Sequence, residues 1–273
     1  MSEFEVFGRM ESDNWSDSSR AAHYVELFSS MTDQSVQALA DAVHAANGRL
    51  ALDVCCGQGN VSEALKDRGC EVSGLDFSQA MLDIARSRVQ GVNFVHGDAQ
   101  NLPFEDNNFD IVVSNFGICH VPDQPRALAE AYRVLRPGGH FAMTVWCGPD
   151  VSPCFELLYG AVKAHGSPEV GLPVGPDFHQ FARIEFATGL LSETRFSNVE
   201  MKVVDCAWVL DRPELLCETF EKATVRAAQL FGAQPPERRA AIRAAMATTV
   251  RERFGDGRRY KVPMPAALVS AGK

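Results

Sequence analysis

The feature that most constrains the fold of this chain is an alternation of short apolar runs and helix-like segments over residues 49–146. The apolar runs have the length of buried strands and lie at residues 50–55, 70–75, 92–96, 109–114 and 140–146. Segments with apolar residues at helical spacing lie at residues 60–67, 78–87 and 125–135. Strands that alternate with helices favour a parallel sheet with helices on both faces. We therefore predict an α/β fold built on a doubly wound, mostly parallel sheet.

Single residues mark the ends of these elements. Ser78 precedes a helical segment and is predicted to be its N-cap, because a serine hydroxyl there accepts a hydrogen bond from a free backbone N–H. The residues Pro-Gly-Gly at 137–139 follow the helical segment 125–135 and are predicted to end it. The run 109–114 is nearly all apolar, which predicts a strand that is buried on both faces.

The patterns outside this region are weaker. Residues 1–45 are predicted to be a polar lead-in followed by helices. After Trp146 the sequence predicts a strand at 200–209, a pair of helices at 213–231 and 235–254, and a last strand at 262–270. We expect the last strand to return to the sheet as part of an edge hairpin. The helices before it are expected to cap the site rather than to form an independent domain.

Charge and composition narrow the classes of partner. The formal net charge is −9 and the pI is about 5.3, and an acidic surface repels phosphate backbones, so nucleic acid is not an expected partner. No apolar run approaches the ~20 residues that a membrane span needs. The acidic N-terminal stretch lacks an apolar signal core, so a cytoplasmic location is expected. The eight cysteines form no C-x-x-C pair and no zinc-ligand spacing, which predicts reduced, buried thiols and no metal site.

Polar residues and glycines follow the predicted strands at their carboxyl ends, where open α/β sheets bind ligands. Asp53 and the Gly57-Gln58-Gly59 loop follow the first run, Asp76 and Phe77 follow the second, Asp98 follows the third, and Asn115 and Phe116 follow the fourth. Glycines let the backbone turn sharply and approach a ligand closely. An acid that binds a ribose diol lies about 20 residues beyond such a glycine loop, and Asp76 lies close to that position. With Asp98 at an adenine amino group, and Phe77 and Met81 on the adenine faces, these residues predict a nucleoside pocket.

The glycine loop distinguishes between two nucleoside cofactors. A dinucleotide fingerprint reads G-x-G-x-x-G, whereas from Gly57 this chain reads G-Q-G-N-V-S, with Ser62 in place of the third glycine. Asp53, just before the loop, suits a cationic ligand better than a pyrophosphate. S-adenosylmethionine carries a sulfonium and an ammonium group, so it is the predicted cofactor, with S-adenosylhomocysteine as its product.

Four sequence blocks, in order and at family spacing, carry a resemblance to a known family. They are LALDVCCGQG (50–59), GLDFSQAML (74–82), GDAQNLPFEDNNFD (97–110) and RVLRPGGHFAMT (133–144). The chain resembles class I S-adenosylmethionine-dependent methyltransferases, in the methyltransferase type 11 group near the ubiquinone and menaquinone C-methyltransferases. The resemblance implies a Rossmann-like methyltransferase fold with a seven-stranded sheet, here with a helical cap.

The resemblance also implies roles for individual residues. Asp53, Gly57 and Gly59 would line the methionine end of the cofactor, and Asp76 would hold the ribose hydroxyls. Phe77 and Met81 would flank the adenine, Asp98 and Ala99 would meet its edge, and Asn115 and Phe116 would lie near the transferring methyl group. Tyr24, in an N-terminal helix, is expected to contact the cofactor. The family usually has glycine where this chain has Cys55, and a β-carbon there is expected to narrow the loop.

The predicted reaction is transfer of a methyl group to the oxygen, carbon or nitrogen of a small, apolar or aromatic metabolite. His120 follows the fourth strand and is the candidate general base if the acceptor is a hydroxyl; the alternative is a histidine that only orders its loop. Other readings of the chain remain: a non-catalytic S-adenosylmethionine-binding scaffold protein, a nicotinamide-dependent oxidoreductase, or a methyltransferase for protein or nucleic acid.

The expected organisation is one methyltransferase domain over residues 1–273. Its parts are an N-terminal helical lid (1–45), a cofactor-binding core (46–150), a helical cap and substrate region with a late strand (151–260) and a final strand (261–273).

Overall fold

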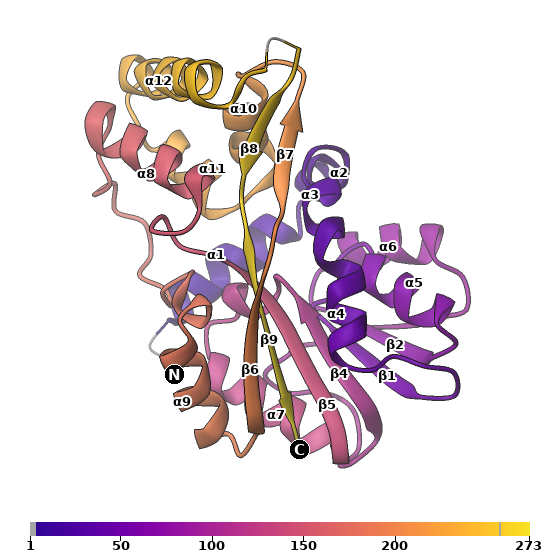
Figure 1. Cartoon of the computed structure of the whole chain (residues 1–273). Coiled ribbons are helices and arrows are strands. Elements are labelled where there is room, and N and C mark those ends of the chain that lie inside the picture. The colour runs from indigo at the N-terminus through magenta and orange to yellow at the C-terminus, as the bar shows by residue number, and fades with distance from the viewer. Residues whose placement is uncertain (1–3, 257) are drawn as a thin grey trace.

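The computed structural model describes residues 4–256 and 258–273 and contains a seven-stranded sheet in the order β3-β2-β1-β4-β5-β9-β6 (Figure 1). The strands of this sheet are β1 (Leu50–Val54), β2 (Glu71–Asp76), β3 (Asn93–His96), β4 (Phe109–Asn115), β5 (Leu135–Trp146), β6 (Ser197–Val204) and β9 (Ala266–Gly272). Neighbouring strands from β3 to β5 pair in parallel, and β9 runs antiparallel to both β5 and β6. The doubly wound, mostly parallel sheet is therefore confirmed.

The strand order reverses at β1, which lies between β2 and β4. Ala51 of β1 pairs with Ile111 of β4, and Leu50 of β1 pairs with Glu71 of β2. Thus β2 and β3 lie on one side of β1 in the sheet, and β4 and β5 lie on the other. Such a reversal opens a crevice at the carboxyl ends of the strands, where open α/β sheets hold their ligands.

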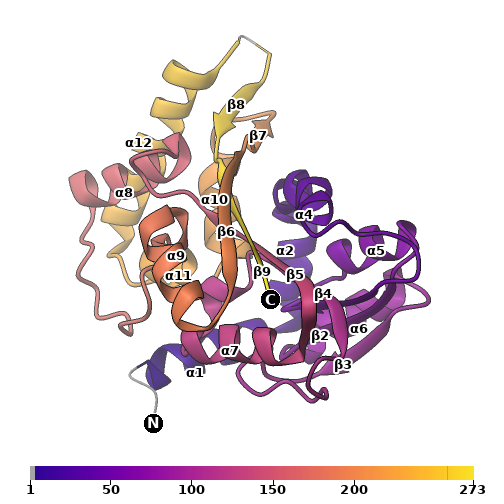
Figure 2. The ribbon, with the colours of Figure 1, turned by 60° about the horizontal axis from the view of Figure 1, so that its bottom comes forward.

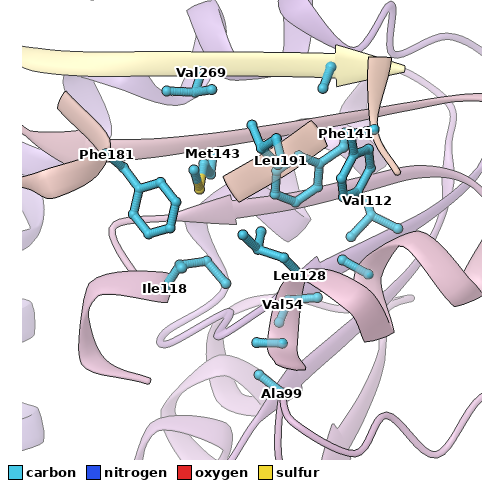
Figure 3. Close-up of a cluster of buried hydrophobic side chains, with 14 of the residues drawn as sticks. Val54, Ala99, Val112, Ile118, Leu128, Phe141, Met143, Phe181, Leu191 and Val269 are labelled. Atoms are coloured by element: carbon cyan, nitrogen blue, oxygen red, sulfur yellow. The ribbon is translucent and has the colours of Figure 1, made fainter. Parts of the chain in front are cut away.

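Helices cover both faces of the sheet (Figure 2). One face packs on α7 (Gln124–Val134) and α9 (Ile184–Glu193), and the other packs on α4 (Val36–Ala42) and α5 (Asn60–Asp67). Figure 3 shows Leu128 of α7 and Leu191 of α9 among the sheet residues Val112, Phe141 and Met143. Each fully buried side chain of this size stabilises the fold by about 1.5–3 kcal/mol.

The ends of the core helices follow local signals. Helix α5 has the predicted bounds, and α6 (Gln79–Arg88) begins after Ser78, whose hydroxyl accepts from the Met81 N–H at 3.2 Å, which confirms the N-cap. Helix α7 ends at Val134, before Pro137 as predicted. The fifth strand is longer than the predicted 140–146, because β5 begins at Leu135. Its glycine segment is held by Lys273, which pairs with the backbone of Gly138 and Gly139.

The predicted strand at 200–209 is wrong as a single strand. Strand β6 ends at Val204, and β7 (Ala207–Leu210) pairs instead with β8 (Tyr260–Pro263) in a separate two-stranded sheet. The last strand returns to the sheet edge as expected, because β9 pairs antiparallel with the edge strand β6 and lies between β5 and β6. Its predicted bounds, 262–270, are wrong, because residues 260–263 belong to β8 and β9 begins at Ala266. Burial explains this order: β9 is mostly buried and made of small and apolar residues, whereas β6 is mostly exposed or half-buried.

The region beyond the sheet is helical. It contains α8 (Pro153–His165), α10 (Leu215–Ala223), α11 (Arg226–Gly232) and α12 (Pro236–Phe254). The predicted helix at 213–231 is two helices, because Thr224 is extended, with φ −120° and ψ 167°. The N-terminal helices are α1 (Glu5–Trp15), α2 (Ser18–Leu27) and α3 (Ser29–Thr32). One apolar cluster joins α8, α10 and α12 to Phe28, which lies between α2 and α3. Among the described residues, no helix combines the length and apolar character needed to cross a membrane.

Candidate active site

A cavity of about 1050 Å³ lies at the carboxyl ends of β1, β2 and β4, with walls from the N-terminal helices and the cap. Ten of the residues predicted for the site line it: Tyr24, Asp53, Cys55, Gly57, Asp76, Phe77, Met81, Asn115, Phe116 and His120. These come from segments far apart in the sequence, and the reversal of strand order brings them to one place.

Three predicted residues lie outside the lining of this cavity. Gly59 is the N-cap of α5 with φ +86°, and a Cβ there would lie 3.1 Å from the Phe94 ring. Asp98 is exposed, and its Oδ1 accepts from the Gln100 backbone N–H at 2.8 Å. Ala99 is buried in the core under the sheet. The adenine contacts expected of Asp98 and Ala99 therefore stay predictions.

Asp53, near the end of β1, is a buried carboxylate with one unused oxygen. Its side chain is 1% exposed, and Oδ2 accepts from the Ser62 hydroxyl at 2.7 Å. Oδ1 is buried and has no hydrogen-bond partner among the described residues. Burial raises the pKa of Asp53 to about 7, because the charged form is poorly solvated. A cation brought into the cavity would stabilise that charged form.

Asp76, at the end of β2, shapes the glycine loop. Its Oδ2 accepts from the Gly57 N–H and its Oδ1 from the Ser78 N–H, both at 2.8 Å. Burial raises the pKa of this carboxyl group, and the two N–H donors act against that shift. Gly57 has φ +52°, and a Cβ on it would meet no atom of residues 4–256 or 258–273 within 4 Å. The backbone of the loop thus faces open space in the cavity.

Cys55 adopts a left-handed backbone conformation, with φ +59°, which glycine adopts without steric cost. This backbone conformation explains why the resembled family usually has glycine at this position. Burial raises the pKa of the Cys55 thiol well above its ordinary value, and the carboxylates of Asp76 and Asp53 act in the same direction. The thiol is thus kept protonated as an uncharged part of the wall.

Asn115 and Phe116 end β4 with different surroundings. The Asn115 amide oxygen accepts from the Ser35 hydroxyl at 2.8 Å and from the Thr144 hydroxyl, and its nitrogen donates to the Thr32 carbonyl at 3.2 Å. These bonds join the N-terminal helices to the sheet. Phe116, with φ +56°, stacks on Trp146 with ring centroids 3.8 Å apart.

The N-terminal helices supply an aromatic wall. Tyr24 stacks on Phe28 at 5.4 Å and meets Trp15 edge-on at 5.3 Å. Burial raises the pKa of Tyr24 to about 12, so its hydroxyl is neutral across the physiological range. Phe77, just before α6, and Met81, in its first turn, pack with Trp15 and Tyr24 in one apolar cluster.

His120 lies in the short turn after β4 and also lines the cavity. Its Nδ1 lies 2.9 Å from Oε2 of Glu11, a residue of α1 that the sequence did not point to. Glu11 stands in an acidic, polar stretch with no motif around it, so no local signal distinguishes it from its exposed neighbours.

The cap adds a second histidine that the sequence did not select. The Nδ1 of His179 lies 3.0 Å from the Trp146 carbonyl, so it carries the hydrogen, and its Nε2 accepts from the Tyr159 hydroxyl at 2.9 Å. Burial lowers the pKa of His179 and raises that of Tyr159 to about 12. Both side chains are therefore neutral, and they place polar atoms in a part of the cavity wall that also contains aromatic rings.

Comparison with known proteins agrees with this architecture. The family model described as a methyltransferase domain matches residues 52–143. Demethylmenaquinone methyltransferase from Staphylococcus epidermidis is 44% identical over 119 residues, which are 41% of this chain and 48% of that protein. The chain therefore spans about half the length of the curated relatives it matches.

Solved structures share the fold at low sequence identity. Phosphoethanolamine N-methyltransferase 2 from Haemonchus contortus, in complex with phosphomonomethylethanolamine and S-adenosylhomocysteine, has a TM-score of 0.54 at 19% identity, covering 88% of this chain and 52% of that chain. The (4+2)-cyclase SpnF has a TM-score of 0.54 at 22% identity, covering 88% of this chain and 81% of that chain. These two likenesses concern the fold, and one fold hosts different reactions. The family-model match is a separate likeness, and it covers residues 52–143, which include β1 to β4 and most of β5.

Proposed function

We propose that this chain transfers a methyl group from S-adenosylmethionine to a small, apolar or aromatic acceptor. The observation that carries the proposal is that two buried carboxyl groups, those of Asp53 and Asp76, line one cavity together with the open Gly57 backbone. In this proposal residues 46–150 bind the cofactor, residues 1–45 form a lid and residues 151–260 form the cap over the acceptor.

The residues present fit this cofactor. Oδ1 of Asp53, which has no hydrogen-bond partner in the described part of the chain, suits the ammonium group of a methionine moiety, because a buried carboxylate oxygen gains most from a cationic donor. The open space at Gly57 admits a ligand against the loop backbone. Each Asp76 oxygen uses one lone pair on a backbone N–H and keeps another for a ribose hydroxyl. When bound, the cofactor supplies a methyl group that is activated on a sulfonium.

The protein then has to align and desolvate the two reactants. Alignment of this kind contributes about 7–11 kcal/mol in well-oriented reactions. Phe116 and Trp146 form a stacked pair in the cavity wall, and Phe28, whose ring meets Trp146 edge-on at 6.1 Å, extends this aromatic wall to Tyr24. These rings exclude water from the reacting atoms.

The acceptor class follows from the rest of the cavity. Its volume, about 1050 Å³, is at the upper end of the range for small-molecule sites, which leaves room for an acceptor beside a nucleoside. Phe155, Phe178 and Phe220 of the cap line that remaining space. The relatives named demethylmenaquinone methyltransferases support an acceptor of quinone type.

Calorimetry with S-adenosylmethionine, S-adenosylhomocysteine and a nicotinamide dinucleotide tests the cofactor assignment. We expect the first two to bind and Asp76→Ala to weaken binding by about ten-fold or more, the value of one charge-assisted hydrogen bond. Asp83→Ala is the matched control, because Asp83 is an exposed residue of α6 that hydrogen-bonds to the exposed side chains of Gln79 and Arg86. Failure of the wild-type protein to bind S-adenosylmethionine would contradict the proposal.

A screen with methyl-labelled S-adenosylmethionine and a panel of phenols and quinols tests the reaction. Label in the organic product supports methyl transfer and identifies the methylated atom by mass spectrometry. Tight cofactor binding with no transfer to any member of a broad panel would favour the non-catalytic scaffold instead.

A further inference from the structure

Glu11 is a carboxylate from the N-terminal helix α1 that is buried behind Trp15 and His120, two residues that line the candidate active site. It is 1% exposed, and its Oε2 accepts from the Trp15 indole N–H at 3.1 Å as well as lying 2.9 Å from His120 Nδ1. Its other oxygen, Oε1, is buried without a hydrogen-bond partner among the described residues. A buried carboxylate is costly unless a positive group lies beside it, and His120 is the group that the fold places there.

The ring of His120 is fixed from several sides. Trp15 meets it edge-on with ring centroids 5.7 Å apart, and Phe178 of the cap meets it at 5.5 Å. Nδ1 is engaged by Glu11, and the neighbouring Cys119 thiol also acts on the ring, whereas Nε2 has no nitrogen or oxygen partner among the described residues. Since His120 lines the cavity, Nε2 is the ring nitrogen left for a bound molecule.

The charges around His120 favour its protonated form. The titratable groups set against it are Glu11 from α1, Cys119 in its own turn and Asp76 from β2. Burial lowers the pKa of His120, but Cys119 and Glu11 outweigh burial and raise that pKa well above its ordinary value. A histidine that is already protonated cannot take a proton from a hydroxyl, so this geometry does not suit a general base. It suits a hydrogen-bond donor to negative charge.

We propose that Glu11 is a positioning residue that holds His120 as a charged donor, whose Nε2–H binds an oxygen anion of the acceptor. The acceptor class is therefore a phenol or enol that binds as its phenolate or enolate. This inference rests on the proposed methyl transfer and replaces proton abstraction by His120 with recognition of an anion.

The reaction balances without a base at this position. The acceptor enters as an anion, its oxygen or the conjugated carbon forms the new bond to the methyl carbon, and the sulfur–methyl bond breaks with its electron pair left on sulfur. For transfer to oxygen the product is the neutral ether. For transfer to carbon, the proton on that carbon is then lost to solvent and the product is again a phenolate or enolate.

Histidine NMR titration of the whole chain tests the charge state without cofactor or turnover. We compare wild type, Glu11→Gln and the control Glu5→Gln, which removes an exposed carboxylate from the same helix. His120→Asn assigns the resonance. The expected pKa of His120 in wild type lies well above its ordinary value, and Glu11→Gln is expected to lower it, because the neighbouring negative charge is removed. Glu5→Gln leaves it unchanged.

A His120 pKa at or below the ordinary value in wild type overturns the proposal, even if the Glu11→Gln variant fails to fold. An unchanged pKa in folded Glu11→Gln overturns the role of Glu11. Because neither measurement involves S-adenosylmethionine, a failure of the proposed methyl transfer is recognised separately, by the calorimetry and the acceptor screen.

Binding of 4-nitrophenol tests the acceptor class, because the absorbance of its phenolate differs from that of the neutral phenol. We expect wild type and Glu5→Gln to bind the phenolate in preference to the phenol. Glu11→Gln and His120→Gln are expected to bind the phenolate about ten-fold more weakly, which is the effect of one charge-assisted hydrogen bond. Preferential binding of the neutral phenol by wild type, or equal phenolate affinity in all four proteins, contradicts the proposal.

Discussion

The β-carbon of Cys55 occupies the space that a side chain at residue 117 would need. A Cβ placed on Gly117 would lie 2.3 Å from the Cys55 Cβ and 2.8 Å from the Ser114 hydroxyl oxygen. The loops after β1 and β4 therefore come into contact at residues 55 and 117, and there is room for a β-carbon at only one of these two residues. The cysteine at the usual glycine position of the resembled family is accommodated because residue 117 is glycine.

This contact predicts a coupled pair of substitutions. Gly117→Ala should destabilise the protein by about 1–3 kcal/mol, the usual cost of overpacking a buried site. Adding Cys55→Gly should recover part of that loss, since it removes the closest atom, and the two changes should be non-additive by at least about 0.5 kcal/mol. Chemical denaturation of the two single variants and the double variant measures the coupling, and additive effects would contradict the contact.

The raised pKa of Asp53 predicts a specific dependence of stability on pH. Its folded-state pKa of about 7 lies above the unfolded value of 3.8, so the folded state holds the proton more tightly. The contribution of Asp53 to stability is therefore fully present below pH about 4 and is lost as the pH rises to about 7. In Asp53→Asn this loss should be absent, and the difference between the two proteins in free energy of unfolding should change across that range. Parallel curves for wild type and variant would contradict the assignment.

The same carboxyl group predicts proton release when a cationic ligand binds. A cation beside Oδ1 lowers the pKa of Asp53, so binding of S-adenosylmethionine near neutral pH should expel a proton and tighten as the pH rises through about 7. Calorimetry in buffers with different ionisation enthalpies counts the released protons. Asp53→Asn should release fewer, and equal proton release by both proteins would place the cation elsewhere.

The bonds of Asn115 predict that this residue supports the N-terminal helices. Asn115→Ala removes an acceptor of the Ser35 hydroxyl, which also donates to the Thr32 carbonyl at 2.9 Å, and removes a donor to that carbonyl. The loss of these bonds should cost about 1–3 kcal/mol in stability. Residues 1–45 should then become more accessible to limited proteolysis, while the core helices keep their protection. Asn93→Ala is the control, because Asn93 is an exposed residue at the start of β3. Unchanged proteolysis of the N-terminal region would show that other contacts hold it.

The sequence by itself determined the elements whose signals are local. Helix α5 has its predicted bounds, and the N-cap at Ser78 lies where the sequence placed it, because helix ends depend on hydrogen bonds between residues a few positions apart. The parallel core was also predictable, since continuous apolar runs separated by helices bury well in one architecture. The residues at the strand ends, among them Asp53 and Asp76, followed from that architecture.

Tertiary structure alone decided the properties that depend on distant packing. The insertion of β9 between β5 and β6 follows from which strand buries better, and the break after Val204 follows from pairing between β7 and β8. Glu11 and His120 are 109 positions apart in the chain, so no local pattern predicts their contact. No sequence motif predicts that Oδ1 of Asp53 lacks a hydrogen-bond partner among the described residues, and none predicts the raised pKa of His120. Both properties arise from desolvation and from neighbours that meet only in the folded chain.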